Sequence, residues 1–153
     1  MSRWGKQFMA FAITISMLHR FHHHCIQFLP LEVFAVVIGY KERDKNVATN
    51  FVHPRILRAT TRSVRADLDD TLRIASQFYT VGFMHTHPGK RSSVAESVAD
   101  RAFHQYMGNH FYQQFGRQAS FLIYAPYPGI FAVYDEAGPQ PHEIMHDTQV
   151  APR

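Results

Sequence analysis

Short apolar runs alternate along this chain with stretches whose apolar residues recur every three or four positions. Runs rich in β-branched and aromatic residues, of about four to eight residues, are typical of β-strands. The run at 31–40, LEVFAVVIGY, is almost continuously apolar and therefore predicts a central strand covered on both faces. Strands are predicted at residues 11–15, 31–40, 47–52 and 79–84 and in the two C-terminal segments SFLIYA and GIFAVYD.

Three stretches show the helical period instead. Ser16 can cap a first helix with Phe21 and Cys25 on its apolar face, and Asp67 can cap a second that carries Leu72 and Ala75. Ser93 and Glu96 fit the Ser-x-x-Glu capping box, which predicts a third helix from about residue 94 to about residue 115. The predicted core positions of this third helix are Val94, Val98, Ala102, Tyr106 and Met107.

Strands and helices in this order predict an α/β fold, a mixed sheet flanked by helices. The length of 153 residues suits one domain. We expect this domain to span residues 1–135. The polar, proline-containing residues 136–153 are expected to form a C-terminal tail.

Composition narrows the function classes. The net charge is +4, but the basic residues are scattered apart from small groups such as RILRATTRSVR, so no nucleic-acid partner is predicted. The single cysteine, Cys25, excludes an internal disulfide and favours a reducing, cytoplasmic location. The apolar run FMAFAITISML is too short to span a bilayer, so no membrane partner is predicted. A secreted protein is the lesser alternative, because basic residues precede this run.

The segment VGFMHTHPGKRSSVAESVAD carries the candidate chemistry. His85 and His87 lie two positions apart at the end of a predicted strand, so both side chains point to one side of the sheet. Ser97 and Asp100 are three apart and share one face of the following helix. Two imidazoles and one carboxylate leave an open position for water, as in catalytic zinc sites, and one zinc ion is the expected cofactor. Iron, manganese and cobalt also accept these ligands.

Hydrolysis at such a centre needs a nearby carboxylate that does not bind the metal and can accept and return protons. Glu32 is the candidate, because it is a lone acid at the start of a run that otherwise reads as buried. A purely structural role at the exposed end of the strand is the alternative.

The glutamate in PLEVFAVVIG, the motif GFMHTHP and the Ser-x-x-Asp sequence together resemble the JAMM (MPN/JAB-domain) metalloproteases. The resemblance covers the chain from ITIS to IFAVYD. It implies a three-layer, cytidine-deaminase-like architecture in which His85, His87 and Asp100 bind zinc. It further implies that Glu32 is the general acid/base and that Ser97 stabilises the developing oxyanion.

The resemblance also implies a substrate: a peptide or isopeptide bond at the C-terminus of a ubiquitin-like protein or its conjugate. Enzymes that activate or conjugate ubiquitin-like proteins are expected as further partners. Two departures from the family pattern stand out. Twelve residues instead of ten separate His87 from Asp100, and Phe34 with Ala35 replaces the usual small pair after Glu32.

Other interpretations fit less well. A catalytically silent MPN-type module that binds partner proteins is the main alternative, and a deaminase-like site lacks the required Pro-Cys-x-x-Cys. The segment His142–His146 matches the His-Glu-x-x-His zinc pattern, but its proline-rich context predicts a short polar turn. His19, His22, His23 and His24 are expected on the polar face of the first helix, and a weak metal site at His19 and His23 is the lesser alternative. His104 lies one turn after Asp100 and is either a partner of that carboxylate or a half-exposed helical histidine.

Overall fold

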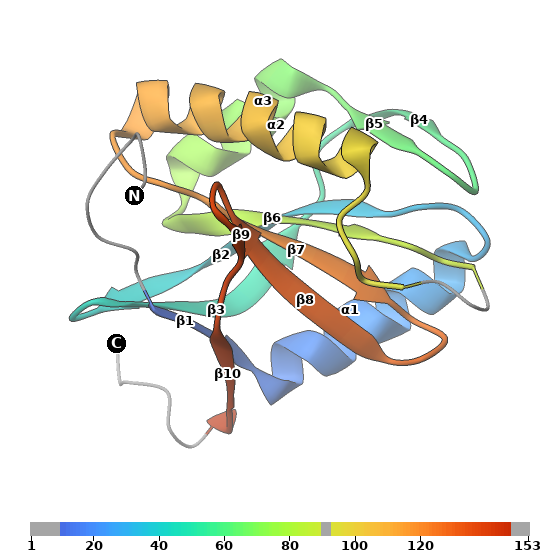
Figure 1. The fold of residues 1–153 in the computed structure, drawn as a ribbon, viewed down its shortest axis with the longest axis horizontal. Coiled ribbons are helices and arrows are strands. Elements are labelled where there is room, and N and C mark those ends of the chain that lie inside the picture. Colours follow the sequence, from blue (N-terminus) through green and yellow to red (C-terminus); the bar gives the residue numbers. More distant parts are fainter. Residues whose placement is uncertain (1–9, 90–92, 148–153) are drawn as a thin grey trace.

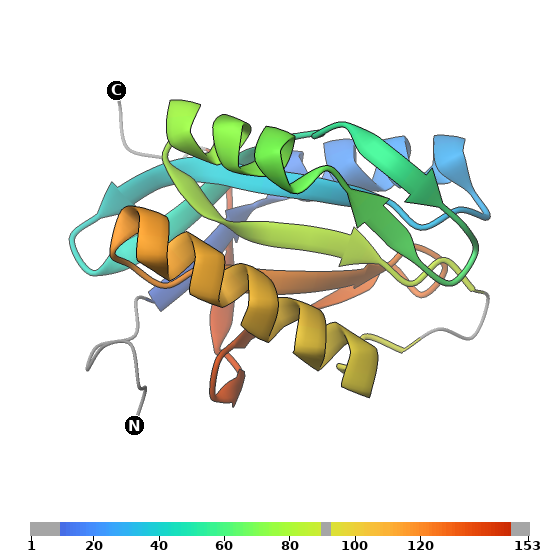
Figure 2. The same cartoon turned by 90° about the horizontal axis from the view of Figure 1, so that it is seen from above.

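The computed structural model describes residues 10–89 and 93–147. A curled mixed sheet forms the middle layer; α1 (Ile15–Phe28) covers one face, and α2 (Leu68–Gln77) and α3 (Val98–Phe115) cover the other (Figure 1). Figure 2 shows α2 and α3 side by side above the sheet, with α1 on the far side. The predicted α/β class and the flanking helices are confirmed.

The main sheet has eight strands in the order β10-β1-β3-β2-β6-β7-β8-β9. β2 lies between β3 and β6 and pairs antiparallel with both, whereas β6 and β7 pair in parallel. This parallel pair lies near the centre of the sheet and leads directly to the candidate site. The strands are β1 (Ala10–Thr14), β2 (Phe34–Glu42), β3 (Lys45–Val52), β6 (Thr80–Thr86), β7 (Ser120–Ala125), β8 (Ile130–Asp135), β9 (Gly138–Pro139) and β10 (His142–Met145).

The continuous apolar run of β2 is explained by its two faces. Ala35 and Val37 pack into the cluster under α1, while Phe34 and Val36 pack into the cluster under α2 and α3. All four side chains are buried. A strand covered on both faces loses the polar alternation of a half-exposed strand. The sequence prediction for this central strand is therefore confirmed, although the strand begins at Phe34 and leaves Glu32 just before it.

The helix starts differ in part from the predictions. Thr14, not Ser16, caps α1, because its hydroxyl accepts the Met17 N–H. Asp67 caps α2 as predicted. In α3 the predicted core positions Val98 and Tyr106 are exposed. The buried residues of that helix are His104, Met107, Gly108 and Phe111.

Two segments that were expected to be irregular form strands. Residues 55–66 contain a small separate hairpin, β4 (Ile56–Ala59) and β5 (Val64–Ala66). In the tail, β9 pairs with the end of β8, and β10 pairs in parallel with β1. Residues 138–139 and 142–145 thus belong to the main sheet.

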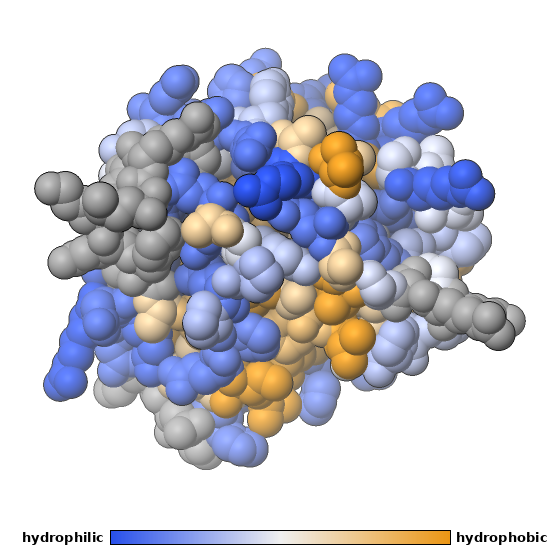
Figure 3. All heavy atoms as spheres, viewed as in Figure 1, coloured by the Kyte–Doolittle hydropathy of each residue, from blue (hydrophilic) through white to orange (hydrophobic). Residues whose placement is uncertain are grey.

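The face in Figure 3 is largely polar, with separate apolar patches between polar side chains. Within the described ranges, none of the helices is both long and apolar enough to cross a bilayer.

Candidate metal centre

The end of β6 supplies the two histidines. His85 is the penultimate residue of β6 and pairs with Phe34 of β2. His87 lies just beyond the strand, and its backbone N–H donates to the Tyr124 carbonyl of β7 at 2.8 Å. This bond extends the parallel pairing by one more residue, so both imidazoles keep the side-chain direction of a strand. His85 is buried and His87 is half-buried.

The first turn of α3 supplies the carboxylate. Ser97 is the N-cap: its hydroxyl accepts the Asp100 N–H, and the Asp100 carboxylate accepts the Ser97 N–H, both at 3.0 Å. The capping box is therefore Ser97–Asp100, and the predicted box of Ser93 and Glu96 is wrong. Side-chain contacts explain the difference, because the Glu96 carboxylate binds His104 and Arg101 of α3 instead of the Ser93 backbone.

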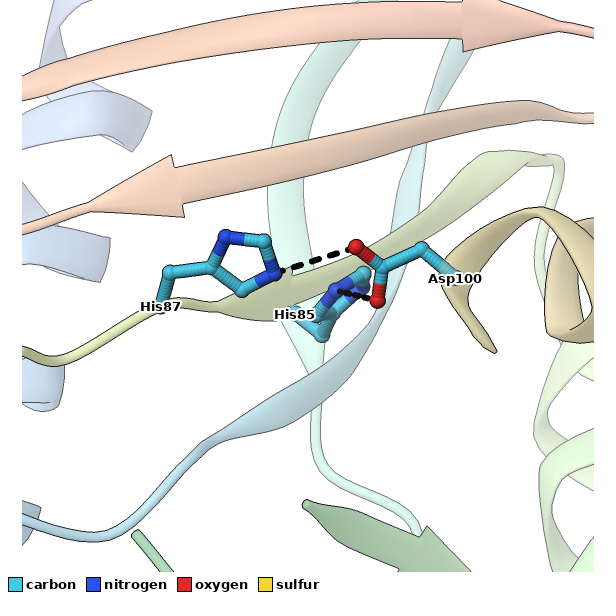
Figure 4. Close-up of side chains that lie close together, drawn as sticks. All are labelled: His85, His87 and Asp100. Atoms are coloured by element: carbon cyan, nitrogen blue, oxygen red, sulfur yellow. Dashed lines mark hydrogen bonds and ion pairs between the residues drawn. The ribbon is translucent and has the colours of Figure 1, made fainter. Parts of the chain in front are cut away.

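Asp100 bridges the two histidines. Its Oδ1 lies 3.1 Å from His85 Nε2, and its Oδ2 lies 3.2 Å from His87 Nε2 (Figure 4). One potential ligand atom from each residue lies within 4.8 Å of the other two. Two imidazole nitrogens and a carboxylate oxygen this close together are a donor set that fits zinc or another divalent transition metal. The structure thus brings together the three predicted ligands.

The side chains of the cluster change one another's pKa. Burial opposes ionisation of Asp100, but hydrogen bonds from His85, His87 and the Ser97 backbone outweigh it and hold the Asp100 pKa well below its usual range. The same Asp100 carboxylate raises the pKa of His87. The ionised form of Asp100 is thus favoured, and a cation that binds here would compete with a proton on His87.

Glu32 lines the same pocket as His85 and Asp100. It is buried, and it lines a pocket of about 150 Å³ with Phe34, His85 and Asp100. Burial raises the pKa of Glu32, and the two histidines oppose this shift. The structure thus places Glu32 within electrostatic reach of the histidines, as the sequence prediction requires.

Thr86, the last residue of β6, connects the histidine strand to the segment that carries Glu32. Its hydroxyl accepts the Val33 N–H at 2.8 Å, and its own N–H donates to the Val33 carbonyl at 3.0 Å. Val33 follows Glu32 in the chain, and Thr86 lies between the two histidines. The pair of bonds therefore fixes the backbone beside Glu32 relative to the histidine strand.

Some residues at the site were not predicted from the sequence. Arg62 and Ser63, from the turn between β4 and β5, line the pocket. Glu96 binds His104 at 2.5 Å behind the cluster, so His104 is buried and does not bind Asp100 directly. The spacing from Asp100 identified His104 as a candidate, but no local signal points to the hairpin or to Glu96.

Among the described residues, the competing sequence features do not form a second metal-binding group. The segment predicted as a polar turn around His142 is the strand β10 instead, in which His142 and Glu143 occupy adjacent positions on opposite faces. Among the described residues, no second group of three metal-binding side chains occurs. Cys25 is buried on the inner face of α1, and burial raises the pKa of its thiol to about 12, which makes it an unreactive packing residue.

Comparison with known proteins gives similarities of structure only. No protein-family model matches the chain, and no curated protein matches it. A JAB1/MPN domain protein from Archaeoglobus fulgidus is 16% identical, with a TM-score of 0.56 over 89% of this chain and 98% of that one. A protein from Desulfitobacterium hafniense is 17% identical, with a TM-score of 0.66 over 90% of this chain and 92% of that one.

A third structure is described as "JAMM: A Metalloprotease-like Zinc Site in the Proteasome and Signalosome". It is 16% identical, with a TM-score of 0.54 over 90% of this chain and 99% of that one. Identities this low establish the fold alone. With its three-layer architecture and a His-His-Asp cluster at the end of β6, the chain has the fold of the JAB1/MPN domain and JAMM proteins.

Proposed function

We propose that this protein is a zinc-dependent hydrolase that cleaves the peptide or isopeptide bond after the C-terminus of a ubiquitin-like protein. The observation that carries the proposal is the convergence of His85, His87 and Asp100 on one point, with Glu32 in the same pocket. A cation held there supplies a Lewis acid that polarises the scissile carbonyl and activates water.

The chain's own residues have separate roles in this proposal. Glu32, which lines the same pocket as the cluster, accepts a proton from the attacking water and returns it to the leaving amine. The Ser97 hydroxyl accepts a hydrogen bond from the Asp100 N–H. A hydroxyl that accepts can still donate its own hydrogen, and in this proposal Ser97 donates it to the developing oxyanion. Asp100 has both oxygens engaged and is suited to binding rather than to proton transfer.

The substrate class rests on the fold and the shape of the site. The similar structure named for the proteasome and signalosome is described by a metalloprotease-like zinc site, and the present cluster is a donor set that fits zinc. A pocket open to solvent, bordered by the β4–β5 turn, suits an extended peptide end. The proposed partners are a ubiquitin-like protein and the enzymes that conjugate it in the cytoplasm.

Metal analysis combined with a cleavage assay tests the proposal. Purified wild type should contain about one equivalent of zinc, and His87→Ala and Asp100→Ala should each lose most of it. Glu32→Gln should keep the zinc but lose roughly 10²- to 10⁴-fold in turnover of a fluorogenic ubiquitin-like conjugate. Retained turnover in Glu32→Gln would exclude Glu32 as the general base.

A catalytically silent protein-binding module is the second candidate. Two observations favour it: Phe34 lines the pocket beside Glu32, and the Ser97 hydroxyl is already engaged in capping α3. In that case wild type purified at neutral pH should hold less than about a tenth of an equivalent of metal. Metal content therefore separates the two functions before any substrate is identified.

A further inference from the structure

The segment 93–97, between His87 and α3, lies against the metal cluster without being helix or strand. Its first residue makes a direct contact with a candidate ligand: the Ser93 carbonyl lies 2.8 Å from His87 Nδ1. A carbonyl can only accept, so Nδ1 must carry the hydrogen. In neutral His87 the lone pair then belongs to Nε2, the nitrogen that lies 3.2 Å from Asp100. The Ser93 carbonyl therefore determines which nitrogen of His87 can bind a metal.

A carbonyl in an irregular segment keeps its direction only if its neighbours are held. The adjacent carbonyl, that of Val94, accepts the Tyr134 hydroxyl at 2.6 Å. Tyr134 is buried, and its backbone pairs with Phe121 of β7. At the other end of the segment, Glu96 binds His104 at 2.5 Å and Arg101 at 3.2 Å. The segment is thus attached to β8 near its start and to α3 near its end.

From these contacts we propose that Tyr134 is a positioning residue for the metal centre. Its hydroxyl holds the Val94 carbonyl, this fixes the Ser93 carbonyl one residue earlier, and that carbonyl orients the His87 ring with Nε2 toward the cation. The inference rests on the proposed metal centre but goes beyond it, because Tyr134 touches neither a ligand side chain nor the reaction pocket. Partners that orient metal-binding histidines commonly contribute 10- to 100-fold to metal affinity.

The test uses the full chain and the substitution Tyr134→Phe, which removes only the hydroxyl. The matched control is Tyr127→Phe in the exposed turn between β7 and β8. Zinc affinity, measured by competition with a chromophoric chelator, should fall about 10-fold in Tyr134→Phe, because Glu96 still holds the other end of the segment. The control should match wild type within about twofold.

A second readout reports on His87 itself. In ¹⁵N-edited NMR of the zinc-loaded protein, the His87 Nδ1–H should exchange with solvent slowly in wild type and faster in Tyr134→Phe. The corresponding signal of His85 should not change. A general loss of packing would affect both histidines, whereas the proposed path affects only one.

The outcomes separate this inference from the proposed function. Absence of zinc binding in wild type would contradict the metal centre and the inference together. Zinc binding in wild type, with equal affinity and equal His87 exchange in Tyr134→Phe, would contradict only the positioning role. A selective change at His87, whatever the peptidase activity, would support it.

Discussion

At the scale of single residues, Glu32 combines burial with an ionisable group. Its side chain is buried just before β2, and burial raises its pKa above the ordinary value of 4.5. His85 and His87 oppose the shift without cancelling it. A carboxyl whose pKa is higher in the folded than in the unfolded state destabilises the fold once pH rises above the unfolded value. Glu32 therefore lowers stability at neutral pH, which is a common property of catalytic groups.

We expect Glu32→Gln to increase the free energy of unfolding of the metal-free protein at pH 7, by on the order of 1 kcal/mol. The increase should shrink as pH falls from 7 toward the ordinary value of 4.5, and little should remain below this value because the carboxyl is then protonated in both states. Urea unfolding at pH 7 and pH 4 in the presence of a chelator measures the difference. If Glu32→Gln were less stable than wild type at pH 7, the ionised Glu32 carboxylate would not destabilise the fold.

The residues of the candidate site differ in how far the sequence reveals them. His85, His87 and Asp100 are recognisable because strand and helix periods bring residues two or three positions apart to one side. Tyr134 and Glu96 were not predicted as site residues. Tyr134 acts through a backbone carbonyl 40 residues away in sequence, and no spacing rule encodes such a contact.

At the scale of elements, α3 shows why a capping motif is ambiguous. Ser93 with Glu96 and Ser97 with Asp100 both have the required three-residue offset. The second pair forms the box because Tyr134 and His104 hold residues 94 and 96 outside the helix. The sequence pattern did not predict the hairpin β4–β5 either. Its strands are short and partly exposed and each contains an arginine, so they lack the apolar alternation of a strand.

The cap of α2 was predicted correctly and offers a clean comparison. Asp67 accepts the Asp70 N–H at 3.2 Å, whereas Asp69 is an exposed acid in the same first turn. Asp67→Ala should lower the free energy of unfolding by about 1 kcal/mol, through loss of the cap. Asp69→Ala removes the same charge without a cap and should cost less than about 0.5 kcal/mol. Equal effects in chemical denaturation would show that the side-chain bond contributes nothing.

At the scale of the whole molecule, the sheet is closed on one side by a strand from the tail. β10 pairs with β1 in parallel, and Met145 packs against Ala12 and Val47. The sequence of the tail is polar and contains prolines. A four-residue strand with three exposed positions has too short an apolar pattern to predict a strand. The pairing depends on the free edge that β1 would otherwise present and on the burial of Met145, and both are properties of the assembled fold.

Adjacent residues of β10 test its contribution. Met145 is 5% exposed and Ile144 is 51% exposed. Met145→Ala should destabilise the protein by about 2 kcal/mol, at the low end for buried methionine because its cluster is small. Ile144→Ala should change stability by less than about 1 kcal/mol. Urea unfolding of the two variants measures the difference, and similar losses would mean that β10 is not anchored through its buried face.

The pairing of β1 with β10 also determines how the protein responds to mechanical force. In a parallel pair the two strands run in the same direction, so Ala10 and Met145 lie at opposite ends of the ladder from Phe11↔His142 to Thr14↔Met145. A pull applied at these two residues loads all bonds of the ladder together, in shear. Were the strands antiparallel, the same pull would break the bonds one after another. The pairing should therefore resist a force that pulls Ala10 and Met145 apart more than an antiparallel pair of the same length would.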